Sequence, residues 1–504
     1  MSRENTQKSY DFLKRRFAQI TNIDNASGIL YKDAETVMAA GSGNDRINQQ
    51  IALGEAAHML IADPRVEDAL NQAEEGKKSL PPQDRRNLAL MRHQWLHTAG
   101  LPEDLSREIS HVSAAGEQLH VAHYKSGNWD KVKAHYERSF NALREAGQFK
   151  KDVLGKDSVY DALVDQFSPG ITVAQINNTF GELDQALRLM IPQAMDKQAR
   201  QDPPLPLKPP FPAQQQEIFS RHVLSLTGFD QKRGVLYAIK GHPSSGGSPD
   251  DSRITTRIDE SDPLFGLLST LHEAGHGIYE QNLPKKWRYQ PAGSSQGMDV
   301  HESQSMIYEL QAALSDDYLT WLAQQLRDTF NRHNDPALAT DNVLRAVRQV
   351  KPSFIRIAAD EMTYPMHVIL RYELERDIIE GALRVRDLPD AWNEKMQEKL
   401  GVTPPDPSQG CMQDVHWPTG AVGYFPSYTL GAMGAAQFFA AATKQQPAII
   451  DALKEGSFIP LRQWLTKNVH SKGSLVESET LFKKATGRPL ETTDFLKHLT
   501  HRYL

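Results

Sequence analysis

DPLFGLLSTLHEAGHGIYEQNLP, residues 262–284, is the stretch of this 504-residue chain that most clearly predicts its own local structure. Asp262 followed by Pro263 is typical of a helix N-cap and a first helical position. Apolar or small residues then recur at helical spacing, namely Leu264, Leu268, Leu271, Gly275 and Ile278. Pro284 cannot continue a helix, so the stretch predicts one helix with an apolar face that ends before this proline.

The same helix carries the pattern His-Glu-x-x-His at His272, Glu273 and His276. Residues four apart lie on one helix face, about 40° from each other, so both imidazoles can reach a single ion. The alternative is a buried helix with two hydrogen-bonded histidines, which is the ordinary state of a single histidine. The complete pattern favours zinc, with Glu273 as the base that takes a proton from the water that zinc binds.

Two histidines leave such a site one protein ligand short, and the best candidate is Glu302 in MDVHESQSMIYELQAAL, residues 298–314. The apolar stripe of a second predicted helix contains Val300, Met306, Ile307, Leu310 and Ala313. Glu302 lies within about 40° of Met306 on this stripe. Burying a carboxylate unpaired costs several kcal/mol, so a metal or an arginine ion pair must accompany it. The alternative third ligands are His301, Glu280 and Glu309.

Six motifs occur in a fixed order along the chain: His242-Pro243, DSRITTR at 251–257, HEAGH at 272–276, HESQ at 301–304, IRIAADE at 355–361, and GCMQDVHWPTGAVGYFPSYTLGAM at 410–433. Together they resemble the carboxypeptidase Taq family of HExxH zinc metallocarboxypeptidases. The first 200 residues resemble the family only weakly. The resemblance implies release of single C-terminal amino acids from peptides, with broad specificity. It also implies one zinc ion per chain, which cobalt could replace, and assembly as a homodimer.

Recognition of a peptide with a free C-terminus requires a group that binds a carboxylate, and arginine suits it because its planar fork stays charged. Arg356 matches the family position for this task, and a helical ion pair with Asp360 is its alternative interpretation. Arg253 and His242 resemble residues that close the groove, although a structural role is as good an interpretation. Three candidates could donate a hydrogen bond to the oxyanion of the tetrahedral intermediate, namely His416, Tyr424 and Tyr428.

One position departs from the family pattern, because Ser244 follows His242-Pro243 where the family has phenylalanine. The aromatic contact at this point is therefore absent or supplied by another residue. The sequence therefore does not predict which side chain packs against the end of the substrate. The predicted metal ligands are unaffected.

Two other classes of function remain as alternatives. A zinc endopeptidase would share the His-Glu-x-x-His chemistry but would not need Arg356 for a terminal carboxylate. A binding or structural protein could keep the metal without turnover, although the intact Glu273 argues against this. Cleavage of amidated peptides would indicate the first, and metal binding without hydrolysis would indicate the second.

The fold is predicted to be mainly α, a single groove-shaped helical body with a small β-sheet next to the zinc helix. RGVLYAIKG (233–241) and SRITTRID (252–259) show the best strand patterns. QDPPLPLKPPFPAQQQ (201–216) predicts an extended strap, since proline repeats cannot form regular helix or sheet. The strap divides a helical N-terminal part, residues 1–200, that walls the groove from a zinc-binding catalytic part, residues 217–504.

Composition narrows the class of partner and the location. The chain has 57 basic and 63 acidic residues, a net charge of −6, and its lysines and arginines are scattered, which gives no support to nucleic-acid binding. Cys411 is the single cysteine, so no internal disulfide can form and a reducing compartment is indicated. The N-terminus lacks an apolar signal core, and the most apolar run, residues 430–442, is too short to span a bilayer. A soluble, cytoplasmic protein without membrane contact is expected.

Overall fold

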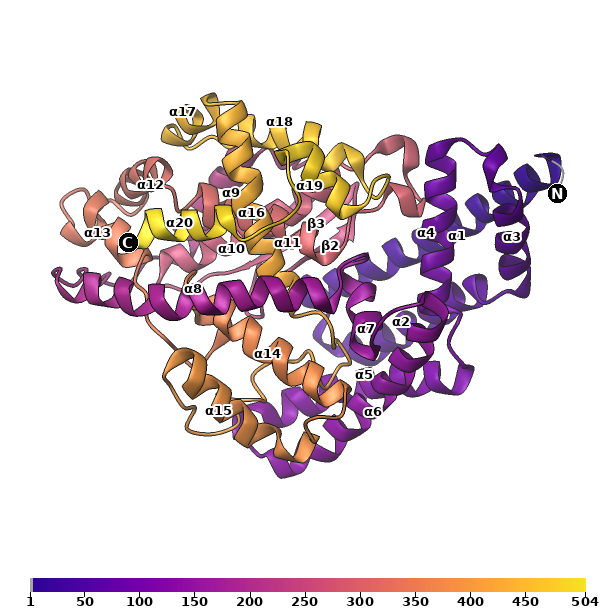
Figure 1. The fold of residues 1–504 in the computed structure, drawn as a ribbon. Helices are drawn as coiled ribbons and strands as arrows, with labels where there is room; N and C mark the ends of the chain where they lie inside the picture. The colour runs from indigo at the N-terminus through magenta and orange to yellow at the C-terminus, as the bar shows by residue number, and fades with distance from the viewer. Residues whose placement is uncertain (1–2) are drawn as a thin grey trace.

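A computed structural model describes residues 3–504, and it is mainly α-helical with one small sheet, as predicted (Figure 1). The first eight helices are α1 (Arg3–Thr36), α2 (Gly43–Ile61), α3 (Pro64–Glu75), α4 (Pro82–Thr98), α5 (Glu103–His123), α6 (Trp129–Leu154), α7 (Val159–Phe167) and α8 (Val173–Ala199). The others are α9 (Ala213–Thr227), α10 (Pro263–Gln281), α11 (Met298–Met306), α12 (Asp316–Thr329), α13 (Thr340–Val347), α14 (Tyr364–Ile379), α15 (Leu388–Leu400), α16 (Pro426–Gln445), α17 (Ala448–Lys454), α18 (Ile459–Asn468), α19 (Ser478–Thr486) and α20 (Thr493–Tyr503). None of them, within residues 3–504, has the length and apolar composition needed to cross a membrane.

The sheet contains three strands, β1 (Gly234–Ile239), β2 (Ser245–Ser248) and β3 (Asp251–Arg257), in the order β1-β3-β2. β1 runs parallel to β3 and β2 runs antiparallel to it. β1 and β3 are the two predicted strands. β2 was not expected, because its sequence, Ser-Gly-Gly-Ser, has no alternation of apolar and polar residues. β3 packs against α10, so the sheet lies beside the predicted zinc helix.

The hydrophobic core has two parts. A small core joins helices of the N-terminal lobe, which we define as α1–α4, residues 3–98; its fully buried members include Tyr10, Leu13, Val66, Leu70 and Met91. The larger core takes in residues from Val132 to Tyr503 and forms the body of the molecule. Figure 1 shows the lobe at the end that carries the N-terminus, with the C-terminus near the opposite end. The lobe therefore has its own packing, and polar contacts can tie it to the body.

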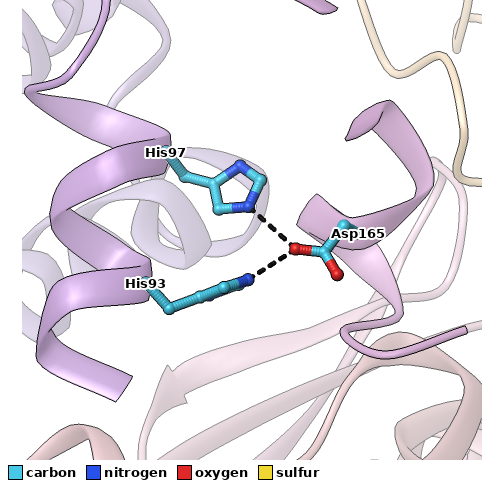
Figure 2. Close-up of side chains that lie close together, drawn as sticks. All are labelled: His93, His97 and Asp165. Atoms are coloured by element: carbon cyan, nitrogen blue, oxygen red, sulfur yellow. Dashed lines mark hydrogen bonds and ion pairs between the residues drawn. The ribbon is translucent and has the colours of Figure 1, made fainter. Parts of the chain in front are cut away.

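Several sets of polar contacts join the lobe to the body, and two of them lie beside groups discussed below. On α1, the buried Lys32 ammonium contacts the hydroxyl of Ser244 and lies 2.8 Å from a carboxylate oxygen of Glu35. Ser244 stands where the family that the motifs resemble has an aromatic residue, and here the Lys32 side chain packs against it. On α4, His93 and His97 reach Asp165 of α7 in the body (Figure 2).

The proline-rich segment runs without helix or strand between α8 and α9. Arg332 donates to the carbonyl oxygens of Lys208 and, at 2.7 Å, Pro210. Asn342 exchanges hydrogen bonds with the backbone of Leu205. The segment is therefore attached to the body along its length, and the larger core takes residues from both sides of it. The division of the chain at this strap stays a prediction.

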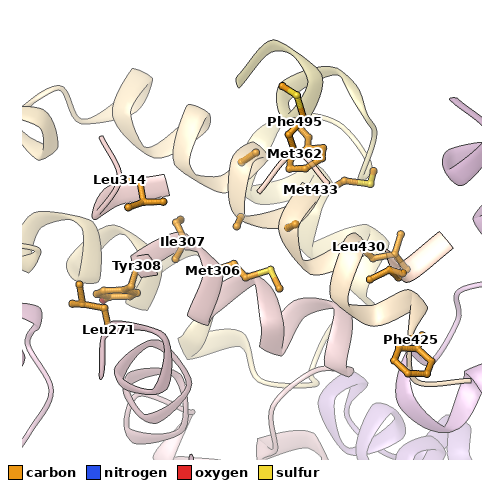
Figure 3. Packing of buried hydrophobic residues seen from close by; sticks show 14 of the residues in the cluster. Leu271, Met306, Ile307, Tyr308, Leu314, Met362, Phe425, Leu430, Met433 and Phe495 are labelled. Carbon is orange, nitrogen blue, oxygen red and sulfur yellow. The ribbon is translucent and has the colours of Figure 1, made fainter. Parts of the chain in front are cut away.

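The centre of the body is the packing of α10, α11 and α16. Figure 3 shows Leu271 of α10, Met306 at the end of α11, and Leu430 and Met433 of α16 within one cluster of buried side chains. Each of these four side chains is less than 5% exposed. Because protein interiors are close-packed, this cluster holds the three helices in one relative position.

Candidate metal centre and active site

α10 presents the predicted pair of histidines. The helix begins where expected, since the Asp262 side chain accepts a hydrogen bond from the Leu264 backbone at 2.9 Å and a proline takes the first helical position. The ring centroids of His272 and His276, one helical turn apart, are separated by 5.0 Å. The two imidazoles therefore face the same side of α10.

Glu302 of α11 lies opposite these imidazoles. Its Oε2 atom is 3.8 Å from Nε2 of His272 and 3.7 Å from Nε2 of His276. Within residues 3–504 Glu302 has no ion pair with a lysine or arginine, although it is only 4% exposed. Tyr424 donates to its other oxygen at 3.3 Å. The carboxylate thus converges with two imidazoles, and no lysine or arginine of residues 3–504 takes the place of a metal ion.

The three alternative ligands, Glu309, His301 and Glu280, lie on the far side of the two imidazoles from Glu302. Glu309 and His301 contact their Nδ1 atoms, and Glu280 contacts His301. Nδ1 of His272 lies 2.7 Å from a carboxylate oxygen of Glu309. Nδ1 of His276 lies 2.6 Å from Nδ1 of His301, whose Nε2 is 3.0 Å from Glu280. Such partners orient a metal-binding imidazole and select its tautomer. Both Nε2 atoms are consequently left to face Glu302.

The position of Glu309 depends on a change in helix type. The chain continues from α11 into a π-helix, Ile307–Ala312, where the sequence predicted an uninterrupted α-helix. A π-helix has a wider turn, so side chains after residue 306 project in new directions. π-helical turns are frequent at functional sites. Glu309 lies in this segment, seven residues after Glu302, and contacts Nδ1 of His272.

Two glycines let the helices approach closely enough to form this cluster. A Cβ atom on Gly275 of α10 would lie 2.3 Å from the carbonyl oxygen of Gln304 on α11. A Cβ atom on Gly431 of α16 would lie 2.5 Å from Cβ of Glu302. Both distances are far inside van der Waals contact. Only glycine therefore fits at these positions without moving Glu302 relative to the imidazoles.

We expect Gly431→Ala to displace Glu302 and to weaken metal binding at least tenfold, since overpacking a core of this kind costs about 1–3 kcal/mol. Metal affinity can be measured by competition with a chelator, alongside the thermal midpoint. Gly181→Ala on α8 is the matched control, because a Cβ atom there meets nothing within 4 Å. Unchanged metal affinity in the Gly431 variant would show that this contact does not set the position of Glu302.

The electrostatics of the cluster favour a cation. Burial lowers the pKa of His272, but Glu309 and the neighbouring Glu273 and Glu302 outweigh it and raise the pKa to about 10. Burial raises the pKa of Glu273 to about 7. Burial also holds the pKa of His276 well below its usual value, so this imidazole is neutral. Three carboxylates around one neutral and one proton-holding imidazole form a site that a divalent ion would neutralise.

A cavity of about 1280 Å³ opens over the cluster. Its wall includes His272, Glu273 and Glu302, and no side-chain hydrogen bond within residues 3–504 engages the Glu273 carboxylate. Other polar residues of the wall include His242, Arg356, Tyr364, Tyr424 and Tyr428. The volume exceeds that of most small-molecule pockets and is suited to several residues of a peptide.

Arg356 is buried in this wall and has a different partner from the one its sequence neighbours indicate. Its Nε and Nη2 atoms donate to one oxygen of Asp414 at 3.0 and 2.9 Å, and Nη1 donates to the hydroxyl of Tyr364 at 3.0 Å. Asp360 instead accepts backbone hydrogen bonds within its own loop. Arg371 also pairs with Asp414, at 2.6 Å, so two guanidinium groups share one carboxylate. The group keeps a net charge of +1.

The other predicted substrate residues divide into two groups. His242, Tyr424 and Tyr428 line the cavity. Arg253 and His416 are absent from its wall. Nε and Nη2 of Arg253 instead donate to the two carboxylate oxygens of Asp251, at 3.1 and 3.0 Å. Nε2 of His416 lies 3.2 Å from the Tyr428 hydroxyl, and burial lowers the pKa of His416 to about 3. His416 is thus a neutral partner that orients Tyr428.

Two cavity residues were missed from the sequence. Arg257 at the end of β3 lies over the ring of Phe265, 4.4 Å from its centroid, and has no carboxylate partner within residues 3–504. Tyr364 belongs to none of the six motifs, but it lies three residues after the IRIAADE element. Arg257 is the last residue of the DSRITTR motif, so its position beside a quoted motif was the available signal. A charged side chain at a strand end facing a ligand cavity is a candidate for substrate binding.

A His-Glu-x-x-His helix with a glutamate from a second helix beside it, on the wall of a large cavity, is typical of the class of metallopeptidases. The sequence profile of the carboxypeptidase Taq (M32) metallopeptidase family matches residues 12–503. The chain belongs to this family and is a metallocarboxypeptidase, a metal-dependent peptide hydrolase. The family resemblance seen in the motifs is therefore confirmed.

Individual relatives agree over nearly their whole length. Carboxypeptidase 1 of Bacillus subtilis is 30% identical over 500 residues, which cover 98% of this chain and 97% of the relative. Thermostable carboxypeptidase 1 of Thermus thermophilus is 32% identical over 480 residues, 94% and 93% of the two chains. The solved structure of Trypanosoma cruzi metallocarboxypeptidase 1 superposes with a TM-score of 0.95 at 32% identity, covering 98% and 99%. The helical fold is thus that of the family.

Proposed function

We propose that this metallocarboxypeptidase uses one zinc ion per chain to release single amino acids from the C-termini of peptides, with broad side-chain specificity. One observation supports this most directly. The cluster of His272, His276 and Glu302 and the buried, net cationic group around Arg356 share one cavity. A metal cluster and a carboxylate-binding group on the same wall suit a peptidase that acts next to a free terminus.

The donor set fits zinc. Two imidazole nitrogens and one carboxylate oxygen are a common catalytic zinc environment, and His272 would give up its proton when the ion binds. The Nδ1 atoms are already occupied by Glu309 and His301. When bound, the ion would polarise the substrate carbonyl and acidify a water molecule. Cobalt could take the same three donors, since its preferences for imidazole and carboxylate are similar.

Glu273 is proposed as the general base and acid. Its carboxylate is buried on the cavity wall beside His272 and is free of protein hydrogen bonds within residues 3–504. It would take a proton from the attacking water and pass that proton to the departing amine. Tyr424 and Tyr428 line the cavity and are the proposed donors to the oxyanion, with His416 holding the hydroxyl of Tyr428.

Arg356 is proposed to bind the terminal carboxylate of the substrate. Asp414 orients the guanidinium, and Arg371 offsets the charge of Asp414, so the group retains an unbalanced positive charge. His242 is proposed to limit the end of the groove, where it lies in the cavity wall. Arg253 would support this end indirectly, through its pairing with Asp251.

A peptide offered in two forms tests this function. Metal-loaded protein is expected to shorten a free-acid peptide one residue at a time and to leave its C-terminally amidated form intact, because an amide carries no charge for Arg356 to bind. Products can be followed by mass, with a chelator-treated sample as control. Internal cleavage of both forms would indicate an endopeptidase. Full metal binding without cleavage of either form would indicate a protein that does not turn over peptides.

Assembly and location complete the proposal. The family resemblance supports a homodimer, and the single cysteine, Cys411, is buried, in keeping with a reducing cytoplasm. Sedimentation of the purified protein at several concentrations would measure the mass of the assembly. A monomer mass at all concentrations would contradict the dimer.

A further inference from the structure

A second cluster of metal-binding side chains lies where the N-terminal lobe meets the body. His93 and His97, four residues apart on α4, direct their Nε2 atoms at the same Asp165 oxygen of α7, at distances of 2.6 and 3.2 Å (Figure 2). One donor atom from each residue lies within 4.8 Å of the other two. None of the three lines the catalytic cavity. The cluster repeats the spacing of the His272 and His276 pair at a separate place.

The donors are suited to a divalent ion. Burial by itself raises the pKa of Asp165, but hydrogen bonds from His93, His97 and Lys156 outweigh it and hold the pKa well below its usual value. Burial lowers the pKa of His97, so this imidazole is neutral. Nδ1 of His97 is buried and has no hydrogen-bond partner within residues 3–504, so only the contact of Nε2 with Asp165 orients this ring. One anionic oxygen and two imidazoles are therefore available together.

The surroundings allow entry and set the strength of binding. The His93 side chain is 30% exposed, whereas those of His97 and Asp165 are 9% and 4% exposed, so an ion can enter past His93. Lys156 contacts the second oxygen of Asp165, so no ammonium group holds the oxygen that faces the imidazoles. Its ammonium group, and that of the nearby Lys150, repel a cation. Binding should therefore be weaker than at the catalytic centre.

We propose that His93, His97 and Asp165 form a second divalent metal site, of zinc-like preference, that fastens the N-terminal lobe to the body. The ion would join α4, which belongs to the small core of the lobe, to α7 in the larger core. The same α7 ends at Phe167, whose ring centroid lies 5.2 Å from that of Tyr424 in the catalytic cavity. The site thus lies on a helix that also supports the catalytic wall.

The test uses full-length protein in which His272→Ala and His276→Ala have removed the catalytic metal cluster. After dialysis against zinc salts, we expect this protein to retain about one zinc per chain and to gain thermal stability on zinc addition. Adding His93→Gln and His97→Gln should abolish both effects. The matched control adds His111→Gln and His333→Gln, two histidines that lie exposed on the surface. Asp165→Asn is a second variant that removes only the carboxylate charge.

Each result decides the proposal. Retained zinc that is lost with His93→Gln/His97→Gln and kept in the control supports it, as does a Kd raised about tenfold or more by Asp165→Asn. Absence of zinc from the starting variant overturns it, and so does zinc that persists after both α4 histidines are replaced. Because the catalytic cluster is absent throughout, the outcome is independent of whether the peptidase proposal holds.

Discussion

Replacing Glu273 by glutamine is expected to lower kcat by about 10²–10⁴-fold, the range that a positioned general base contributes. Glutamine has almost the same shape, so metal content and thermal midpoint should stay close to those of the parent protein. The reason for the loss is chemical, because an amide cannot accept the proton of the attacking water. Turnover of a free-acid peptide, measured together with metal content in the same sample, checks the expectation.

Glu309→Gln is the matched control for this change, since it removes a carboxylate of the same cluster that contacts Nδ1 of His272 at 2.7 Å. Loss of such an orienting partner typically weakens metal affinity by about 10–100-fold. At saturating metal, however, the Glu309 variant should keep most of its kcat. Near-normal turnover in the Glu273 variant, or an equal loss in both, would remove Glu273 from its proposed role.

Replacing Arg356 by glutamine is expected to lower kcat/KM for free-acid peptides by roughly 10²-fold or more. Removing one partner of a buried, hydrogen-bonded charge pair costs about 2–5 kcal/mol. The preference for the free acid over the amidated peptide should collapse, because the net charge of the group with Asp414 and Arg371 falls from +1 to 0. The ratio of the two kcat/KM values is the decisive measurement.

Two further variants separate binding from structure. Arg356→Lys keeps the charge but loses the planar fork, so it should retain part of the preference for the free acid. Arg257→Gln removes the other guanidinium of the cavity wall, which has no carboxylate partner within residues 3–504, and should leave that preference intact. Metal content and thermal midpoint show whether each variant is folded. If the preference survives in both Arg356 variants and is lost with Arg257→Gln, the terminal carboxylate binds to Arg257.

Local signals along the chain were enough to predict α10, β1 and β3. Asp262, Pro263 and Pro284 mark the limits of α10, and they act through the backbone of neighbouring residues. β2 was not predicted because Ser245–Ser248 forms a strand only through its pairing with β3, while the preceding Ser244 contacts Lys32 of α1, far earlier in the chain. Contacts of this kind leave no periodic pattern in the strand itself.

The roles of the side chains around His272 and His276 also could not be read from local sequence signals. The sequence left His301, Glu280 and Glu309 open as ligands beside Glu302. The structure places all three behind the imidazoles, and only Glu302 on the side of their Nε2 atoms. Likewise, Asp360 is close to Arg356 in the chain, yet the partner is Asp414, 58 residues away. Sequence spacing identifies which donors are near one another on a helix but not which face of a neighbouring helix they meet.

The sequence by itself determined the family and the helix that presents His272 and His276 on one side, because residues i and i+4 share a helix face wherever the helix lies. Only the tertiary structure decided how the third donor reaches them. That depends on the close approach of α11 to α10 at Gly275 and to α16 at Gly431. Packing across separate helices sets distances to within a fraction of an ångström, and no periodicity in one segment encodes it.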